Sequence, residues 1–151
     1  MKIYLDVSCL NRPFDDQSQP RIRLEAEAVI QIFHCFEKGM WEHVASEMSE
    51  IEIAAINDLD RRKRIAALLP EVDNILPLSD GVFRQAEHLE RKGFPAADSV
   101  HLAAAEFTGA DVFLTCDDRL LRRARKLRRL LKLDVANVHI WLAENYDATN
   151  T

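Results

Sequence analysis

The sequence is poor in the features on which disulfide-stabilised, disordered and membrane-spanning proteins depend. Its three cysteines, Cys9, Cys35 and Cys116, are widely spaced and form no C-x-x-C pair. This argues against a disulfide framework or a zinc site and fits a reducing cytoplasm. Four glycines and five prolines leave little scope for extended disorder. There is no run of about 18 apolar residues and no signal-peptide cleavage pattern, so we expect neither a membrane partner nor export.

The sequence does contain enough apolar residues for one core, together with one strongly basic segment. Hydrophobic residues make up 48% of the 151-residue chain, so we expect a single domain over residues 1–151. The net charge is −5, yet residues 119–132 contain eight of the twenty lysines and arginines and no acidic residue. The rest of the chain therefore holds twelve basic residues against 25 acidic ones. A basic patch on an otherwise acidic protein is what an anionic partner requires.

Short apolar segments alternate with amphipathic ones along the chain. Strands are predicted over residues 2–7, 41–46, 111–116 and 135–140, with an ambiguous strand or connector over 74–79. Helices are predicted over residues 21–39, 81–93, 94–109 and 117–132, with further helical segments after Ser46, in RRKRIAALLP and in WLAENY. This alternation predicts a parallel sheet with helices on both faces. In such folds the ligand site lies beyond the carboxyl ends of the strands.

Acidic residues stand at the ends of two predicted strands. Asp6 ends an apolar strand, where a carboxylate is costly unless it is paired or bound to a cation, although a loop cap is the simpler alternative. Asp117 and Asp118 follow the strand over 111–116. Asp118 is the natural N-cap of the next helix, which leaves Asp117 without a structural role. Thr115 is either an ordinary strand residue or a hydrogen-bond donor to a carboxylate.

Glu52 has two interpretations that depend on where its helix begins. If the helix begins at Ser49, Ser49 and Glu52 form an S-x-x-E capping box. If it begins at Ser46, Glu52 lies within an apolar stripe, where an acid needs a cation or a hydrogen-bond partner. The members of that stripe are Met48, Ile51, Ala55, Ile56 and Leu59. We favour the second interpretation and place Glu47 and Glu50 on the surface.

Asp98 lies in the first turn of a helix that otherwise consists almost wholly of small and apolar residues. Its position suits the helix macrodipole, which is the simpler interpretation. The many alanines, however, indicate close packing against the sheet, which would leave Asp98 at a buried helix end near the strand ends. His101 follows three residues later with the spacing of a ligand, but a hydrogen-bonded structural role is the expectation for a single histidine.

Four acids from separate elements therefore converge on one predicted edge of the sheet. These acids are Asp6, Glu52, Asp98 and Asp117. Carboxylate oxygens are the ligands that hard divalent cations prefer, so the set predicts a site for Mg²⁺ or Mn²⁺. Such ions activate water and stabilise the attacking and leaving oxygens in phosphodiester cleavage.

This pattern resembles that of the PIN-domain family, metal-dependent ribonucleases that include many toxins of toxin–antitoxin pairs. The matching segments are YLDVSCL around Asp6, SEMSEIE ending at Glu52, AADSVHLAAA around Asp98 and ADVFLTCDDRLL around Asp117. The last two are the most specific, and the resemblance covers essentially the whole chain. It implies a three-layer α/β/α sandwich with a central parallel sheet, one or two Mg²⁺ or Mn²⁺ ions, and RNA as the substrate.

The resemblance also implies roles for individual residues. The implied catalytic and metal-binding residues are Asp6, Glu52, Asp98 and Asp117, with Glu52 binding directly or through water. The supporting positions are Ser8, Thr115 and Asp118. The implied products carry 3′-hydroxyl and 5′-phosphate ends, and the implied partners are an antitoxin and a second copy of the chain. The sequence departs from the family pattern in two places. The loop NRPFDDQSQPRIR is long and charged. The adjacent Asp117 and Asp118 leave open which aspartate is the primary ligand.

The basic segment has a simple interpretation and a functional one. Its apolar stripe, Leu120, Ala124, Leu127 and Leu131, is expected to face the core, so basic residues cover the exposed face of a solvated amphipathic helix. The functional alternative is contact with an RNA backbone, which would weaken steeply with salt. The residues assigned to that contact are Arg119, Arg122, Arg123 and Lys126. An acidic antitoxin and then a membrane surface are less favoured.

Other protein classes fit less well. A haloacid-dehalogenase-like phosphatase needs a second aspartate two residues after the first, and that position is Ser8. A response-regulator receiver needs an acidic pair, a central aspartate and a late lysine at strand ends, a placement that this sequence lacks. The remaining alternative to a ribonuclease is a catalytically weak or inactive module that binds RNA or protein on the same scaffold.

Overall fold

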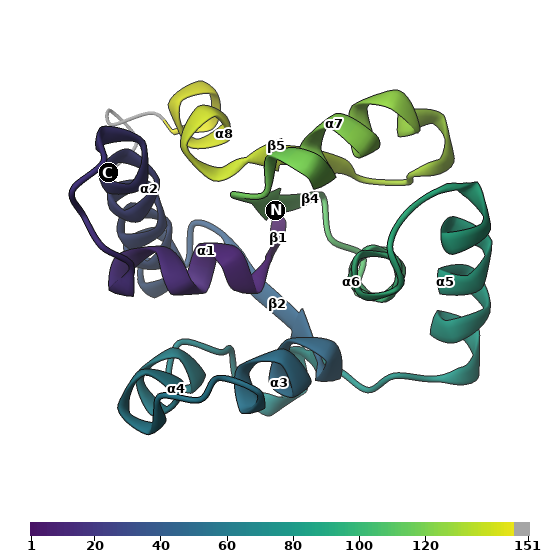
Figure 1. Cartoon of the computed structure of the whole chain (residues 1–151), viewed down its shortest axis with the longest axis horizontal. Coiled ribbons are helices and arrows are strands. Elements are labelled where there is room, and N and C mark those ends of the chain that lie inside the picture. Colours follow the sequence, from purple (N-terminus) through teal and green to yellow (C-terminus); the bar gives the residue numbers. More distant parts are fainter. Residues whose placement is uncertain (147–151) are drawn as a thin grey trace.

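The computed structural model describes residues 1–146 and has one central sheet with helices on both faces (Figure 1). Within these residues the sheet contains five strands: β1 (Lys2–Leu5), β2 (Glu42–Ser46), β3 (Ile75–Leu76), β4 (Val112–Thr115) and β5 (Asp134–Asn137). Every pairing is parallel, and the strand order is β3-β2-β1-β4-β5. The predicted α/β/α sandwich with a central parallel sheet is therefore confirmed.

The helices fall between the strands in the chain, as the alternating pattern predicts. The α-helices of the described residues are α1 (Val7–Asn11), α2 (Pro20–Glu37), α3 (Glu47–Ala54), α4 (Leu59–Ala66), α5 (Asp80–Lys92), α6 (Ala96–Phe107), α7 (Asp118–Lys126) and α8 (Val138–Asn145). Short 3-10 turns cover Arg12–Phe14, Val72–Asn74 and Arg128–Leu130. In Figure 1, α1, α2 and α8 lie on one side of the sheet and α5, α6 and α7 on the other.

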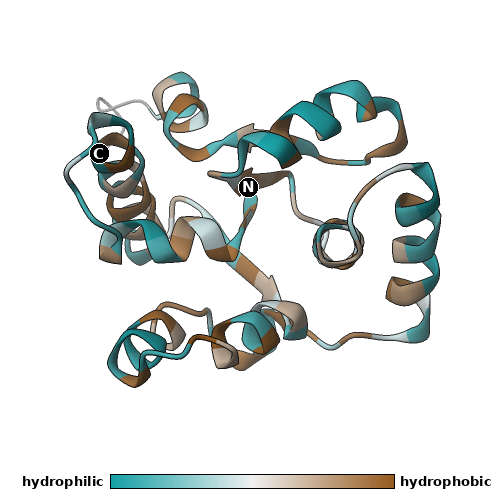
Figure 2. Ribbon diagram, in the orientation of Figure 1, coloured by the Kyte–Doolittle hydropathy of each residue, from teal (hydrophilic) through white to brown (hydrophobic). Residues whose placement is uncertain are grey.

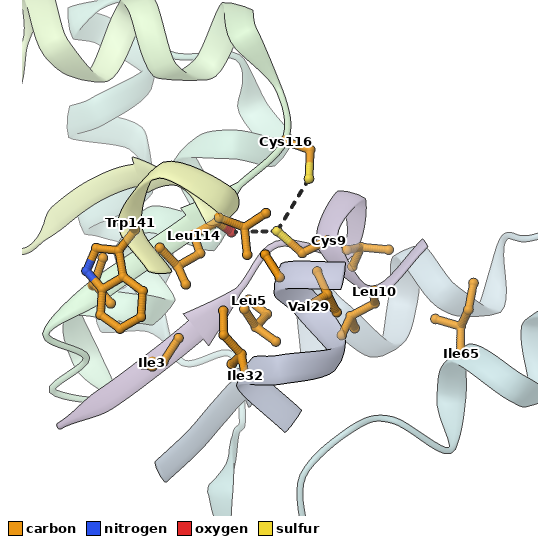
Figure 3. Packing of buried hydrophobic residues seen from close by; sticks show 14 of the residues in the cluster. Ile3, Leu5, Cys9, Leu10, Val29, Ile32, Ile65, Leu114, Cys116 and Trp141 are labelled. Carbon is orange, nitrogen blue, oxygen red and sulfur yellow. Dashed lines mark hydrogen bonds between the residues drawn. The ribbon is translucent and has the colours of Figure 1, made fainter. Parts of the chain in front are cut away.

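The first apolar layer packs on one face of the sheet. Successive side chains of a strand point to opposite faces, so Ile3 and Leu5 of β1 share this side. They join a buried cluster that includes Val29 and Ile32 of α2 and Trp141 of α8 (Figure 3). Nearly all of these side chains are fully buried, which fixes α2 and α8 against the sheet.

The second apolar layer occupies the opposite face. Tyr4, between Ile3 and Leu5, points to this side and stacks on Phe113 of β4 with ring centroids 5.2 Å apart. Leu89 of α5 and Leu102 of α6 belong to the same cluster. The alanines that precede the end of α6 are completely buried, so the predicted close approach of this helix to the sheet is confirmed.

Element boundaries differ from the prediction at the last strand and at the basic helix. β5 ends at Asn137 rather than residue 140, because the Asn137 side chain accepts hydrogen bonds from the backbone N–H groups of His139 and Ile140 and so begins α8. The basic helix α7 ends at Lys126, and a separate 3-10 turn replaces the predicted continuation to residue 132. The short helix α1 was not indicated by the sequence.

The three cysteines are buried and free of disulfide bonds. Cys9 Sγ lies 3.3 Å from the Leu114 carbonyl oxygen and 3.8 Å from Cys116 Sγ (Figure 3). Burial raises the pKa of the Cys9 thiol well above its usual range, so the thiol stays protonated. Across residues 1–146, no helix combines the length and the apolar character needed to cross a bilayer.

Candidate active site

Asp6 follows β1 and is held by hydroxyl groups from two elements. Its backbone N–H donates to the Leu114 carbonyl at 2.9 Å, which extends the β1–β4 pairing to the strand end. Its Oδ2 atom accepts from Ser8 Oγ at 2.8 Å and from Thr115 Oγ1 at 2.7 Å. The structure therefore brings the predicted supporting residues Ser8 and Thr115 directly onto the predicted acid Asp6.

The two adjacent aspartates have different roles from those predicted. The Asp117 Oδ1 atom accepts from the backbone N–H groups of Arg119 at 2.9 Å and Leu120 at 3.4 Å, so Asp117 is the N-cap of α7. Asp118 is already helical and forms an ion pair with both terminal nitrogens of Arg21, each at 2.7 Å. The prediction that Asp118 caps the helix was wrong, because the Asp117 side chain accepts from the N–H groups of the first turn and Asp118 already lies within the helix.

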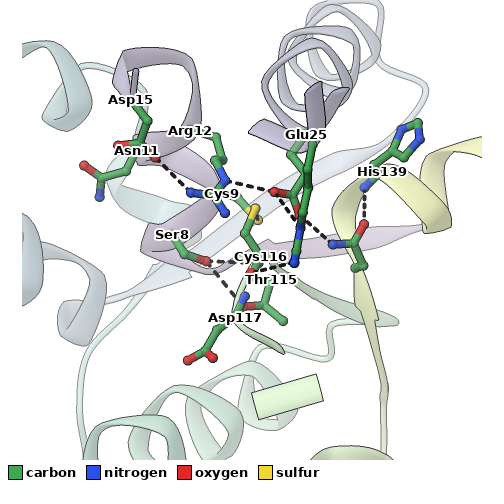
Figure 4. Close-up of polar contacts among 12 residues, drawn as sticks. Ser8, Cys9, Asn11, Arg12, Asp15, Glu25, Thr115, Cys116, Asp117 and His139 are labelled. Atoms are coloured by element: carbon green, nitrogen blue, oxygen red, sulfur yellow. Dashed lines mark hydrogen bonds and ion pairs between the residues drawn. The ribbon is translucent and has the colours of Figure 1, made fainter. Parts of the chain in front are cut away.

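Asp117 nevertheless remains at the carboxyl end of β4. Thr115 Oγ1 accepts from the Asp117 backbone N–H at 3.0 Å, and Ser8 Oγ accepts from the Cys116 N–H at 3.1 Å. Ser8, Thr115 and Asp117 thus form one hydrogen-bonded turn (Figure 4). Because the cap uses Oδ1, the other carboxylate oxygen of Asp117 is available to a ligand.

Glu52 lies on α3, which begins after Ser46, as favoured from the sequence. Ser46 and Ser49 form a reciprocal capping box at this end, so the alternative box of Ser49 with Glu52 is not made. The predicted apolar stripe was wrong, since α3 ends at Ala54, Ile51 is 56% exposed and the buried positions are Ser49 and Ile53. Glu52 is still directed inward, because its Oε1 atom hydrogen-bonds to Nε2 of the buried His101.

Asp98 occupies the first turn of α6 and is partly buried. Its pKa is raised to about 6, first because burial disfavours the charged form and then because Asp6 and Asp117 repel it. Glu52 raises the pKa further, and His101 lowers it. The four predicted acids therefore interact electrostatically, although no side-chain hydrogen bond to Asp98 is formed within residues 1–146.

The chemistry of these residues fits a hard divalent cation, since it is built from carboxylate oxygens. The unfavourable charge on Asp98 is also the kind that a cation relieves. However, within residues 1–146 no three His, Cys, Asp or Glu side chains are placed closely enough to form a ligand set. The donors suit Mg²⁺ or Mn²⁺ in kind, and binding would require their side chains to draw together.

Sequence reasoning missed a second polar cluster beside this edge. Glu25 of α2 is only 1% exposed, and its carboxylate contacts Arg12 Nε at 3.0 Å, Arg21 Nε at 3.5 Å and Asn137 Nδ2 at 2.7 Å (Figure 4). Arg12 also pairs with Asp15 at 3.1 Å. Much of the charge in the loop after α1 is thus paired internally. A glutamate among the apolar positions of α2 was the sequence signal for this cluster.

The basic helix borders a groove of about 1160 Å³ between α7, β5 and the start of α2. Leu120 and Ala124 face the core as predicted, and the outer surface of α7 is mostly hydrophilic (Figure 2). The basic residues that line the groove are Arg21, Arg122, Arg125, Arg128 and Lys132. Of the four basic residues assigned to RNA contact, only Arg122 is among them. The groove extends from Asp111, before β4, to Asp118 and Asn137 at the carboxyl edge.

Comparison with known proteins agrees with this fold. A sequence model of the family described as PIN domain matches residues 3–127. A solved structure of FitAB bound to an IR36 DNA fragment resembles the chain with a TM-score of 0.58 and 19% sequence identity. The match covers 91% of this chain and 95% of that chain, and at this identity it concerns the fold alone. No curated protein matches. Since the matched family model spans most of the sequence, the chain belongs to the PIN-domain family, whose members are generally nucleases.

Proposed function

We propose that this PIN-domain protein is a ribonuclease that hydrolyses RNA phosphodiester bonds with Mg²⁺ or Mn²⁺. The single observation that carries the proposal is that Asp6 and Asp117, which follow the paired strands β1 and β4 of a PIN-domain chain, are joined through the Thr115 hydroxyl. Burial and repulsion by these two acids raise the pKa of the nearby Asp98. Mutually repelling carboxylates at a functional edge are the usual environment of a divalent-cation site. Asp6, Asp98 and Asp117 are the proposed ligands, with Glu52 binding directly or through water.

Each residue has a distinct task in this proposal. A bound divalent cation supplies an activated water and stabilises charge on the phosphate oxygens. Ser8 and Thr115 hold Asp6 in one orientation through their hydrogen bonds to Oδ2. The backbone N–H groups at the start of α7 orient Asp117 through Oδ1. Preorganised side chains of this kind reduce the cost of assembling ligands when a cation binds.

The groove beside α7 supports RNA as the substrate. Arg122 and Arg125 of α7 line it with Arg128 and Lys132 from the segment that follows, and the groove reaches the same edge of the sheet as Asp117. Arg21 of α2 and four acidic residues complete its charged lining: Glu25, Asp111, Asp118 and Asp134. Phosphate groups of a strand lying in this groove would meet basic side chains before reaching the acidic site. We also propose a cytoplasmic toxin with an antitoxin partner and a homodimeric assembly, as the family resemblance implies.

The test is cleavage of a mixed panel of single-stranded and structured RNAs with Mg²⁺ or Mn²⁺. Asp117→Asn is the sharpest variant, because asparagine is as good an N-cap as aspartate and removes only the charge. We expect Asp117→Asn and Asp98→Asn each to lower the cleavage rate at least about 100-fold. Asp118→Asn is the matched control, with a rate close to that of the wild type. Full activity in Asp98→Asn would contradict the mechanism.

A second candidate function is an RNA- or protein-binding module with little or no turnover. The observation in its favour is that no ligand set is assembled within residues 1–146, while Glu52 is already bonded to His101. This module predicts that the wild type retains RNA on a filter but cleaves none of the panel with either cation. Metal-dependent cleavage that Asp117→Asn abolishes would rule it out.

A further inference from the structure

A hydrogen-bonded series of buried polar side chains connects the sheet to Glu52. Tyr4 on β1 is completely buried, and its hydroxyl contacts Ser46 Oγ at 2.7 Å, Ser49 Oγ at 3.2 Å and His101 Nδ1 at 2.8 Å. His101 on α6 is 2% exposed, and its other ring nitrogen bonds to Glu52 Oε1. This hydrogen-bonded series thus links four elements: β1, the end of β2, α3 and α6.

The direction of the first of these hydrogen bonds is set by the Glu52 carboxylate, at the end of the hydrogen-bonded series. A carboxylate oxygen only accepts, so His101 donates from Nε2 to Glu52. The other ring nitrogen, Nδ1, meets the Tyr4 hydroxyl: it accepts from that hydroxyl when the ring is neutral and donates to it when the ring is protonated. The serine hydroxyls at Ser46 and Ser49 can each donate to or accept from the Tyr4 oxygen, so the side chains of this network find partners in either state, as a buried network requires.

Apolar packing alone does little to fix the position of Glu52. The helix that carries it, α3, has eight residues, and its buried positions are only Ser49 and Ile53. Ile51 on the same helix is 56% exposed. The orientation of the Glu52 carboxylate therefore depends on the bond to His101, whose ring is held in turn by Tyr4.

We propose that His101 is a positioning residue for Glu52. It holds Oε1 and leaves Oε2 to face a cation or its bound water, in the way that outer-shell partners orient metal ligands. This inference rests on the proposed divalent-cation site and extends it to four buried residues: His101, Tyr4, Ser46 and Ser49. Tyr4 fixes the ring, and Ser46 and Ser49 fix Tyr4.

The test measures Mn²⁺ binding by calorimetry at a temperature at which circular dichroism shows each variant folded. His101→Leu removes the donor, whereas His101→Gln keeps an N–H donor on a side chain of similar reach. We expect His101→Leu to weaken Mn²⁺ binding about 10–100-fold and His101→Gln to restore most of that loss. If His101→Leu does not fold, Tyr4→Phe takes its place, since it removes only the hydroxyl that holds the ring, with a smaller loss expected.

A double-mutant cycle distinguishes positioning from a general effect on the fold. In a Glu52→Gln background, His101→Leu should cause no further loss of Mn²⁺ affinity, because its effect passes through Glu52. Unchanged Mn²⁺ affinity in His101→Leu, with only a lower Tm, would overturn the inference and leave the nuclease proposal standing. Weakened binding together with a wild type that cleaves no RNA would overturn only the nuclease. Absence of Mn²⁺ binding to the wild type would overturn both.

Discussion

At the carboxyl edge of the sheet, the surroundings of Asp6 and those of Asp98 stabilise a negative charge to different extents. We call these two places the Asp6 corner and the Asp98 corner. At Asp6, one carboxylate oxygen receives two hydroxyl hydrogen bonds, from Ser8 and from the buried Thr115. At Asp98, no side-chain hydrogen bond is made within residues 1–146, and burial and neighbouring acids raise the pKa to about 6. The fold itself compensates the charge at Asp6, while the charge at Asp98 needs a proton or a cation. The Asp98 corner is therefore where an ion would change the energy most.

The largest effect on the free energy of unfolding is expected at the Asp6 corner, where hydroxyl groups of the fold stabilise the carboxylate. Thr115→Val keeps the shape of a buried side chain but removes the hydroxyl that donates to Asp6 and accepts from the Asp117 N–H. Buried polar groups that lose a partner cost about 1–3 kcal/mol, so we expect a loss of that size in the free energy of unfolding. Urea denaturation of the metal-free protein measures it.

Ser8→Ala is the matched control for Thr115→Val. Ser8 also donates to Asp6 and accepts from the Cys116 N–H, but it is partly exposed, so water can replace it. We expect a clearly smaller loss for this variant. Equal losses at both positions would mean that burial of the Thr115 hydroxyl is not what stabilises the Asp6 corner.

The positions of the four acids were predictable from the sequence, because strand ends and helix starts are encoded locally. The division of roles between Asp117 and Asp118 was not. Both are good N-caps by local propensity, and in the fold Asp117 caps the helix while Asp118 meets Arg21, which lies 97 residues from it in the chain. A single sequence gives no indication of which of two adjacent carboxylates meets a distant arginine.

The inward direction of Glu52 was predicted for a reason that proved wrong. The apolar stripe assumed a helix that continues to Leu59, whereas α3 ends at Ala54 and a new helix begins at Leu59. Glu52 points inward because of His101, a partner 49 residues away. The expected hydrogen-bonded role of His101 was right, but its partners Tyr4 and Glu52 are set by the tertiary fold.

An intermediate effect on the free energy of unfolding is expected from removing the charge of Asp98. The pKa of Asp98 rises from 3.8 in the unfolded chain to about 6 in the fold, so the folded protein favours the protonated form. Its contribution to stability is fully present below pH 3.8 and is lost as the pH rises through about 6. In chelator at about pH 7.5, Asp98→Asn should be more stable than the wild type by about 1 kcal/mol, after allowance for solvent screening.

The pH dependence provides the check on this second prediction. The stability advantage of Asp98→Asn should disappear as the pH falls below 3.8, where the wild-type carboxyl is protonated in both states. Thermal unfolding in chelator at several pH values measures the difference. A variant that is less stable than the wild type near neutral pH would mean that the acids at this edge do not repel one another.

The smallest effect is expected at Asp118, which belongs to neither the Asp6 nor the Asp98 corner and is paired with Arg21. Its pKa is lowered, chiefly by the hydrogen bond from Arg21, so its contribution is present above pH 3.8 and is lost as the pH falls through the lowered pKa, opposite in sign to Asp98. Because the pair is exposed, Asp118→Asn should lower the Tm only slightly near neutral pH, and by less still in about 1 M KCl. A loss of stability as large as that of Thr115→Val, and insensitive to salt, would mean that the carboxylate of Asp118 rather than that of Asp117 caps α7. Asp117 would then lack its hydrogen bonds to the first turn of α7 and, like Asp98, would be a carboxylate that the fold does not stabilise.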